Sequence, residues 1–390
     1  MALDCQAAAD KLIDKARALH AKNLTVVNIH GGVDMYIIGD AMCGSLAICF
    51  SNTVLGWFCN NNEGFGIDHL IPGDKPIKIS LLGKCEGRFP VMNWFTRQIK
   101  TLDMSKFEGI EVTSFANSFA LMYELKDICF GDFDTSEAVS FLSMFMCCES
   151  LETIDLSKFN TSKVEDTSHM FEYCAKLKSL DLSNFSFRNL SHATSMFEGC
   201  TDLGDIKFST AVECNDSDYV TLDSMFCECS HIESIDISCI KTENVYDMSK
   251  MFFLCRHLEN IVMPNISCVK NVCAKLLFND CKMLKNVDAR SLDIEFTTKL
   301  DNRGTRINSY ANWRDAFNNC EQLEELRLNS IKIVADAKTL ESNIYCSSIN
   351  IFKGCKSLKK IYLHKKPDSC TVHMLKEMLK LSPDFKIEVM

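Results

Sequence analysis

The chain of 390 residues lacks the features that would assign it to a membrane, to the secretory pathway or to a familiar class of enzyme. No apolar run approaches the ~20 residues that a transmembrane helix needs. Charges at Asp4, Asp10, Lys11 and Asp14 interrupt any signal-peptide core. The sequence also has no G-x-S-x-G, H-E-x-x-H, P-loop or G-x-G-x-x-G motif. We therefore expect a non-enzymatic cytoplasmic protein, with a secreted or cell-surface protein as the alternative.

The chain has fewer basic than acidic residues. The chain has 42 lysines and arginines against 52 acidic residues, which gives a net charge of −10. An acidic surface repels nucleic acid and anionic lipid, so we expect neither as a partner. One segment departs from this balance, because residues 353–390 hold nine lysines and four acidic residues. This segment forms either a docking surface for an acidic partner or a solvated end of the molecule.

Phenylalanine, in contrast, is abundant and regularly placed. Nine phenylalanines follow one another at intervals of 26, 26, 26, 29, 26, 26, 39 and 35 residues, and a cysteine stands three residues after each one from the second onward. A fixed period of this size is typical of stacked repeats. The phenylalanines are Phe119, Phe145, Phe171, Phe197, Phe226, Phe252, Phe278, Phe317 and Phe352, and the cysteines are Cys148, Cys174, Cys200, Cys229, Cys255, Cys281, Cys320 and Cys355.

One repeat unit shows the expected local structure. Leu180 and Leu182 alternate with Asp181 and Ser183, which predicts a short strand with one apolar face. The preceding stretch, 164–171, favours a short helical or 3₁₀ turn. Strands of successive coils then form a parallel sheet, and the repeated cysteines are expected to be buried, unbonded thiols that pack as small apolar groups.

The repeats resemble the BspA-like, Treponema-type leucine-rich repeat family, whose variant repeats read LDLS-x-F-x-T-S and M-F-x-x-C. The closest copies are residues 151–164 with Met170-Phe171, and residues 232–238 with Met251-Phe252. This resemblance covers roughly residues 97–364. It implies an α/β solenoid, a right-handed leucine-rich-repeat-like array with a parallel sheet. It also implies protein binding, adhesion or surface display, with no catalytic residues in the repeats.

The two ends lack the repeat, and a stacked array needs caps. Residues 1–96 predict a small α+β domain with a helix at 3–19 and strands at 24–29, 34–38, 45–50, 54–58 and 77–82. Residues 97–364 would form about ten coils. Residues 365–390 predict a C-terminal cap with a helix at 371–381, Thr371 as its N-cap, and a strand at 385–389.

The candidate binding site follows from the outward position that comes after the central apolar residue of each strand. Parallel strands align these positions into one stripe, and solenoids bind through such surfaces. Its alternative is a solvated stripe in which aspartate is simply part of the repeat. The stripe comprises Asp103, Cys129, Asp155, Asp181, Lys207, Asp236, Val262, Asp288, Arg327 and Tyr362.

Two longer intervals add insertions at 293–313 and 333–350, which we expect to be loops carrying contact residues. The predicted site for a partner protein therefore comprises Asp288, Arg327, Lys360, Tyr362, His364, Tyr310 and Trp313. No cofactor or metal is expected, and the oligomeric state stays open.

Two weaker hypotheses concern chemistry. His231 and His257 occupy the same register two residues after repeat cysteines, a pairing that zinc can use. Cys43 lies in the same segment as His20, His30 and His69, and a thiol beside an imidazole is a nucleophile. The second pattern keeps an enzyme in residues 1–96 as an alternative function.

Overall fold

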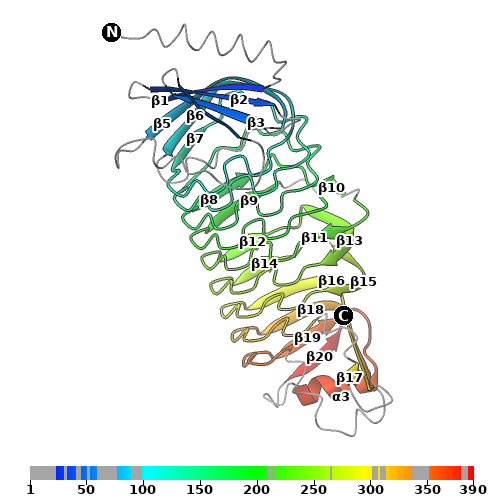
Figure 1. Cartoon of the computed structure of the whole chain (residues 1–390). Helices are drawn as coiled ribbons and strands as arrows, with labels where there is room; N and C mark the ends of the chain where they lie inside the picture. The colour runs from blue at the N-terminus through cyan, green and yellow to red at the C-terminus, as the bar shows by residue number, and fades with distance from the viewer. Residues whose placement is uncertain are drawn as a thin grey trace. The chain divides into compact units, whose positions relative to one another are not determined.

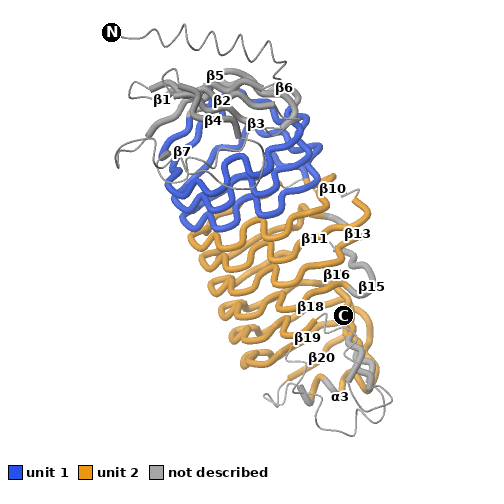
Figure 2. Tube along the Cα trace, in the orientation of Figure 1, with its two compact units in different colours: residues 1–186 blue, residues 187–390 orange. Residues whose placement is uncertain are grey.

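The computed structural model describes mainly strands and turns. The described residues are 23–29, 33–40, 45–50, 53–58, 77–88, 99–209, 213–214, 217–263, 266–300, 306–307, 313–335, 351–378 and 385–390. Their contacts divide the chain into two units, Met1–Ser186 and Phe187–Met390 (Figure 2). Within these ranges no helix combines the length and the apolar character needed to cross a bilayer.

The first unit begins with a sheet of seven strands in the order β4-β3-β2-β1-β5-β6-β7 (Figure 1). Strands β1 to β5 pair antiparallel along the path β4-β3-β2-β1-β5, whereas β5, β6 and β7 are parallel. All five strands predicted in the N-terminal segment are confirmed, and the fifth runs further than expected. The predicted helix at 3–19 lies outside the described residues. The strands are β1 Asn23–Ile29, β2 Val33–Asp40, β3 Ser45–Phe50, β4 Thr53–Phe58, β5 Ile77–Arg88, β6 Ile99–Ser114 and β7 Asp127–Cys129.

This sheet joins the N-terminal strands directly to the first repeat strands. The β5–β6 ladder extends from Ile77↔Ile99 to Arg88↔Ser114. Further along the unit, strand β8 covers Ser179–Leu182, as the alternation of Leu180 and Leu182 predicts. The division of the chain into two caps and a repeat region stays a prediction.

The turns between strands form a hydrogen-bond ladder of their own. In the first unit the amides of Asn117, Phe119 and Leu121 donate to carbonyls of the next coil at 2.8, 2.9 and 2.7 Å. The amides between them, those of Ser118 and Ala120, bond back within their own coil. Every second amide is thus used to hold one coil on the next.

The expectation of a helical or 3₁₀ turn before each phenylalanine is wrong. The segment consists of consecutive turns in which the residues two before and two after the phenylalanine have positive φ. In the first described coil these are Asn117 at +61° and Leu121 at +64°, and in a later coil Ser224 at +55° and Glu228 at +63°. Glycine stands at this second position in two coils, Gly199 and Gly354. These left-handed residues point every second amide toward the neighbouring coil. In a helix those amides would bond within their own segment.

In the second unit the main sheet is built from parallel strands in the order β12-β14-β16-β18-β19-β20, with β17 antiparallel on β16. A smaller sheet has the order β10-β13-β11, with β15 on β13. The strands are β9 Asp205–Phe208, β10 Glu213–Cys214, β11 Val220–Thr221, β12 Ser234–Asp236, β13 Ile240–Asp247, β14 Asn260–Val262, β15 Ile266–Cys273, β16 Asn286–Leu300, β17 Arg306–Ile307, β18 Glu325–Ala335, β19 Lys360–Leu363 and β20 Lys386–Val389.

The insertions at the longer intervals do not begin as loops. Strands β16 and β18 pair a second time beyond the repeat strand, from Asp293↔Ser330 to Thr298↔Ala335. The sequence of this stretch has the period-two pattern of a strand, with apolar residues at Ile294 and Phe296 and, on the paired segment, at Ile331. Residues 301–305, 308–312 and 336–350 of the insertions lie outside the described residues.

The core is a stack of phenylalanine rings. Neighbouring rings of the repeat lie 5.2–5.6 Å apart between centroids, and within 5–26° of parallel, in both units. The repeat cysteines are buried and free, as predicted. For seven of them the Sγ atom donates to the carbonyl of the phenylalanine one coil earlier, for example Cys255 to Phe226 at 3.0 Å. These residues therefore hold the stack together.

The C-terminal segment contains one described helix, α3 (Ser369–Met378), followed by the predicted strand β20. Thr371 is not its N-cap. Asp368 caps the helix instead, since its Oδ1 accepts the amide of Thr371 at 2.7 Å. Thr371 is fully buried in the first turn.

Candidate functional site

The predicted stripe is a straight row in the second unit. The parallel register places Asp236, Val262, Asp288, Arg327 and Tyr362 side by side, and β20 adds Glu388. We call these six residues the strand-face row. The preceding positions, among them Val287, Leu326 and Ile361, are fully buried. The row therefore lies on the exposed face of the sheet. In the first unit the same register pairs Asp103 with Cys129.

The aspartates of the repeat have a structural task. In each case Oδ1 accepts the amide of the serine two residues later at 2.9 Å, in the pairs Asp155–Ser157, Asp181–Ser183 and Asp236–Ser238. This contact forms an Asx turn. Hydrogen bonds from the Ser157 hydroxyl and amide lower the pKa of Asp155. These three aspartates therefore stabilise the fold. We look for function at the exposed positions that do not form this turn.

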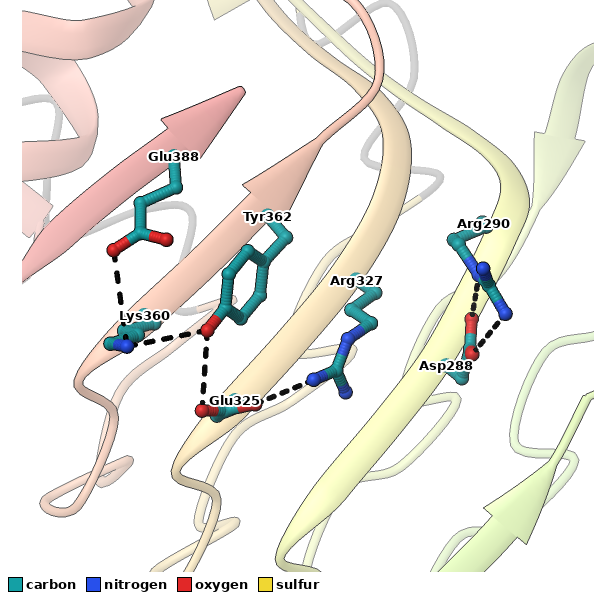
Figure 3. A network of polar contacts seen from close by, with 7 residues as sticks. All are labelled: Asp288, Arg290, Glu325, Arg327, Lys360, Tyr362 and Glu388. Atoms are coloured by element: carbon teal, nitrogen blue, oxygen red, sulfur yellow. Dashed lines mark hydrogen bonds and ion pairs between the residues drawn. The ribbon is translucent and has the colours of Figure 1, made fainter. Parts of the chain in front are cut away.

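Asp288 is the first charged position of the strand-face row at which the carboxylate makes a different contact. It is followed by Ala289 and Arg290, and both of its carboxylate oxygens accept from the Arg290 guanidinium at 2.8 Å (Figure 3). The pair is bidentate, which fixes both side chains in one plane. The carboxylate in turn raises the pKa of Arg290. Asp288 therefore offers a paired carboxylate rather than an Asx turn.

The next two departures form an aromatic–cation cluster. The Arg327 guanidinium lies over the Tyr362 ring, 5.0 Å from its centroid, and Nη2 donates to Glu325 at 2.8 Å. Lys360 also lies over this ring, at 5.7 Å, and its Nζ donates to the Tyr362 hydroxyl at 3.3 Å. The hydroxyl donates to Glu325 at 3.4 Å (Figure 3). The contact with Tyr362 raises the pKa of Lys360. These contacts hold a half-exposed ring and two cations in fixed positions.

The other predicted site residues lie outside this cluster or outside the described residues. His364 is exposed at the end of β19, and its amide donates to the carbonyls of Leu328 and Asn329. Trp313 was predicted to be a contact residue, and the structure contradicts this. Only 2% of its surface is exposed, because it packs in the core next to the Phe317 turn. Tyr310 lies outside the described residues.

The positive charge of the lysine-rich C-terminal segment is partly compensated. Four of its lysines lie within ion-pair distance of acidic residues, three of which belong to preceding coils. The pairs are Lys356–Glu321 at 3.1 Å, Lys359–Glu324 at 3.0 Å, Lys360–Glu388 at 3.9 Å and Lys365–Asp293 at 3.6 Å. The same kind of pair occurs in the first unit, as in Lys178–Glu152. These lysines therefore link coils, and they do not form an isolated basic patch.

Sequence reasoning missed Glu325, the acidic member of the cluster, and also Arg290. Glu325, Lys360 and Lys386 share a second row, two residues before the strand-face row, and Arg290 lies two residues after it. The period of two in a strand puts all these side chains on the same face. Applying that period to both sides of the stripe would have found them.

The geometry of the described residues does not support the zinc hypothesis for His231 and His257, and the Cys43 hypothesis falls outside those residues. The ring centroids of His231 and His257 lie 5.8 Å apart. The Nδ1 atom of His231 is hydrogen-bonded to the carbonyl of Thr201, and that of His257 to the carbonyl of Ser230. The repeat cysteines Cys229 and Cys255 are buried. Among the residues that the structure describes, no group of three potential metal ligands occurs. Cys43 and its predicted histidine neighbours lie outside those residues.

Comparison with known proteins gives one family. Residues 89–210 and 206–325 each match the model described as "Mycoplasma protein of unknown function, DUF285", and together they span more than half of the chain. No curated protein matches. A solved structure that matches is the "Crystal structure of TLR13-ssRNA13 complex", with 12% identity over 79% of this chain and 54% of that chain. Its TM-score of 0.22 is too low to support an argument.

Proposed function

We propose that this chain, which belongs to the Mycoplasma DUF285 family, is a non-enzymatic repeat scaffold that binds a partner protein. The proposed site is the exposed strand face of its C-terminal coils. The observation that carries the proposal is the cluster of Arg327, Tyr362 and Lys360, which stands where the structural aspartates of the row end. Arginine and tyrosine are residue types enriched at the centres of protein interfaces.

The cluster is suited to binding because it is already ordered. Glu325 fixes both Arg327 and the Tyr362 hydroxyl, so the side chains lose little rotamer freedom when a partner docks. The ring offers apolar area and the two cations offer charge to an acidic or carbonyl-rich surface. The bidentate Asp288–Arg290 pair lies one strand further along the same row and extends the polar rim.

We further propose that the repeats form a right-handed leucine-rich-repeat-like solenoid of the BspA-like type. The parallel register of the main sheet and the stacked phenylalanines support this architecture. We also propose a cytoplasmic location, in which the free repeat thiols would persist in a reducing environment. The alternative is a surface or secreted adhesin, for which the same face would be the adhesive one.

A pull-down with matched variants tests the function. The intact chain, the triple variant R327A/K360A/Y362A and the control K158A/K163A/K178A are immobilised and exposed to an extract of the cells that produce the protein. The control removes three ion pairs between coils of the first unit, so it tests the loss of charge and of inter-coil contacts. We expect the control to recover the same partner as the intact chain and the site variant to lose it. Equal recovery by all three proteins would reject this face as the binding site.

A further inference from the structure

The last strand of the main sheet has one edge to which the sheet topology assigns no partner. β20 pairs in parallel with β19 and ends the strand order of this sheet. The amides of Lys386 and Met390 donate to Lys359 and Leu363 of the β19 segment, both at 2.9 Å. Amides alternate in direction along a strand, so those of Ile387 and Val389 point to the opposite edge. No strand among the described residues pairs with that edge.

The side chains of this edge strand are self-complementary. Lys386 and Glu388 lie on the same face, since they share rows with Lys360 and Tyr362. An antiparallel copy centred on Ile387 places Lys386 opposite Glu388 of the second copy, and Glu388 opposite the second Lys386. Opposite charges directly across two strands attract each other. Val389 adds apolar surface, with 52% of its area exposed.

We propose that two copies of this chain associate through antiparallel pairing of their β20 strands. A two-fold axis passes beside Ile387, which exchanges both of its outward backbone hydrogen bonds with its symmetry mate. Phe385 and Val389 exchange the next ones on each side. Such a contact is isologous, with the same residues on both copies. It adds strands to an open edge in the manner of β-augmentation.

This pairing has a consequence for the exposed face. The strand-face row of each copy ends at Glu388, which lies opposite Lys386 in the second row of the symmetry mate. The dimer thus carries two Arg327–Tyr362 clusters on one continuous sheet. The contact is small, and small interfaces give weak or transient complexes. We therefore expect a reversible dimer in the micromolar range.

Reciprocal charge reversal tests the proposal. K386E puts two pairs of acids across the axis, and E388K puts two pairs of lysines there. The double variant K386E/E388K restores opposite charges, and so does an equimolar mixture of the two single variants. K353E makes the same charge change as K386E at an exposed position outside β20. Sedimentation equilibrium on the intact chain of 44.1 kDa measures the dimer population of each sample.

We expect each single variant to weaken the dimer about tenfold relative to the unmodified chain, as the sum of the cross-strand pairs predicts. K353E should leave the dimer unchanged, and both the double variant and the mixture should recover it. Circular dichroism confirms that every variant keeps its strands. An unmodified chain that stays monomeric over the concentration series overturns the proposal. A dimer that the single variants leave intact also overturns it, because another surface would then hold the two copies.

Discussion

Two glutamates of one coil should respond in opposite ways to replacement by glycine. Glu228 and Glu233 are both exposed and five residues apart, Glu228 in the turn after Phe226 and Glu233 directly before β12. Glu228 has a φ of +63°, whereas Glu233 is not among the residues with positive φ. The amide of Glu228 donates to Phe253 of the next coil at 2.7 Å, and this bond fixes the left-handed conformation.

The expected magnitudes follow from the backbone alone. An L-residue in the left-handed region costs about 1–2 kcal/mol, and glycine does not bear this cost. Glycine loses about 0.5–1 kcal/mol more through the entropy of the unfolded chain. Glu228→Gly should therefore stabilise the protein by about 0.5–1 kcal/mol. Glu233→Gly has only the entropic loss and should destabilise it by about 0.5–1 kcal/mol.

Urea denaturation followed by circular dichroism measures the difference between the two variants. Gly199 occupies the position of Glu228 in an earlier coil, at a φ of +72°, and provides the reverse experiment. Gly199→Ala should destabilise the protein by about 1 kcal/mol. Most substitutions to glycine destabilise, so a gain at Glu228 is a demanding result. The reasoning fails if Glu228→Gly lowers the urea midpoint as much as Glu233→Gly does.

Three further outcomes are expected. Phe252→Leu should cost about 0.5–1.5 kcal/mol more than Phe352→Leu in urea denaturation, because the Phe252 ring stacks on two described neighbours and the Phe352 ring on one. Burial raises the pKa of Asp223 to about 6 from 3.8. The stabilisation from its proton is thus complete below pH 3.8 and lost as the pH rises through about 6, so Asp223→Asn should raise the urea midpoint at pH 7 and not below pH 3.8. Burial also raises the pKa of Cys255, so alkylation of the native protein, read by mass spectrometry, should label the exposed Cys129 before Cys255.

Strands could be predicted from the sequence because their signal is local. Alternation of apolar and polar residues located β8, β20 and the five N-terminal strands, and the spacing of the repeat placed Arg327 beside Tyr362. The turns could not be predicted in the same way. Leu121 and Glu228 carry no sign of a left-handed backbone, since the bonds that impose it come from the next coil. Trp313 was misread because an aromatic residue in an insertion suits either a contact surface or the core.

The row of exposed residues also shows why a repeat consensus hides function. An aspartate that forms an Asx turn has a structural role, so its charge is no evidence for a ligand. Asp288 has the same residue type, but arginine replaces the serine two residues later and the carboxylate turns to that side chain. At the next two positions of the row, arginine (Arg327) and tyrosine (Tyr362) replace the aspartate. All three lie on β16, β18 and β19, the strands joined across the two stretched intervals of the repeat. On these three strands a change of spacing thus accompanies a change of chemistry, and this supports the binding site proposed above.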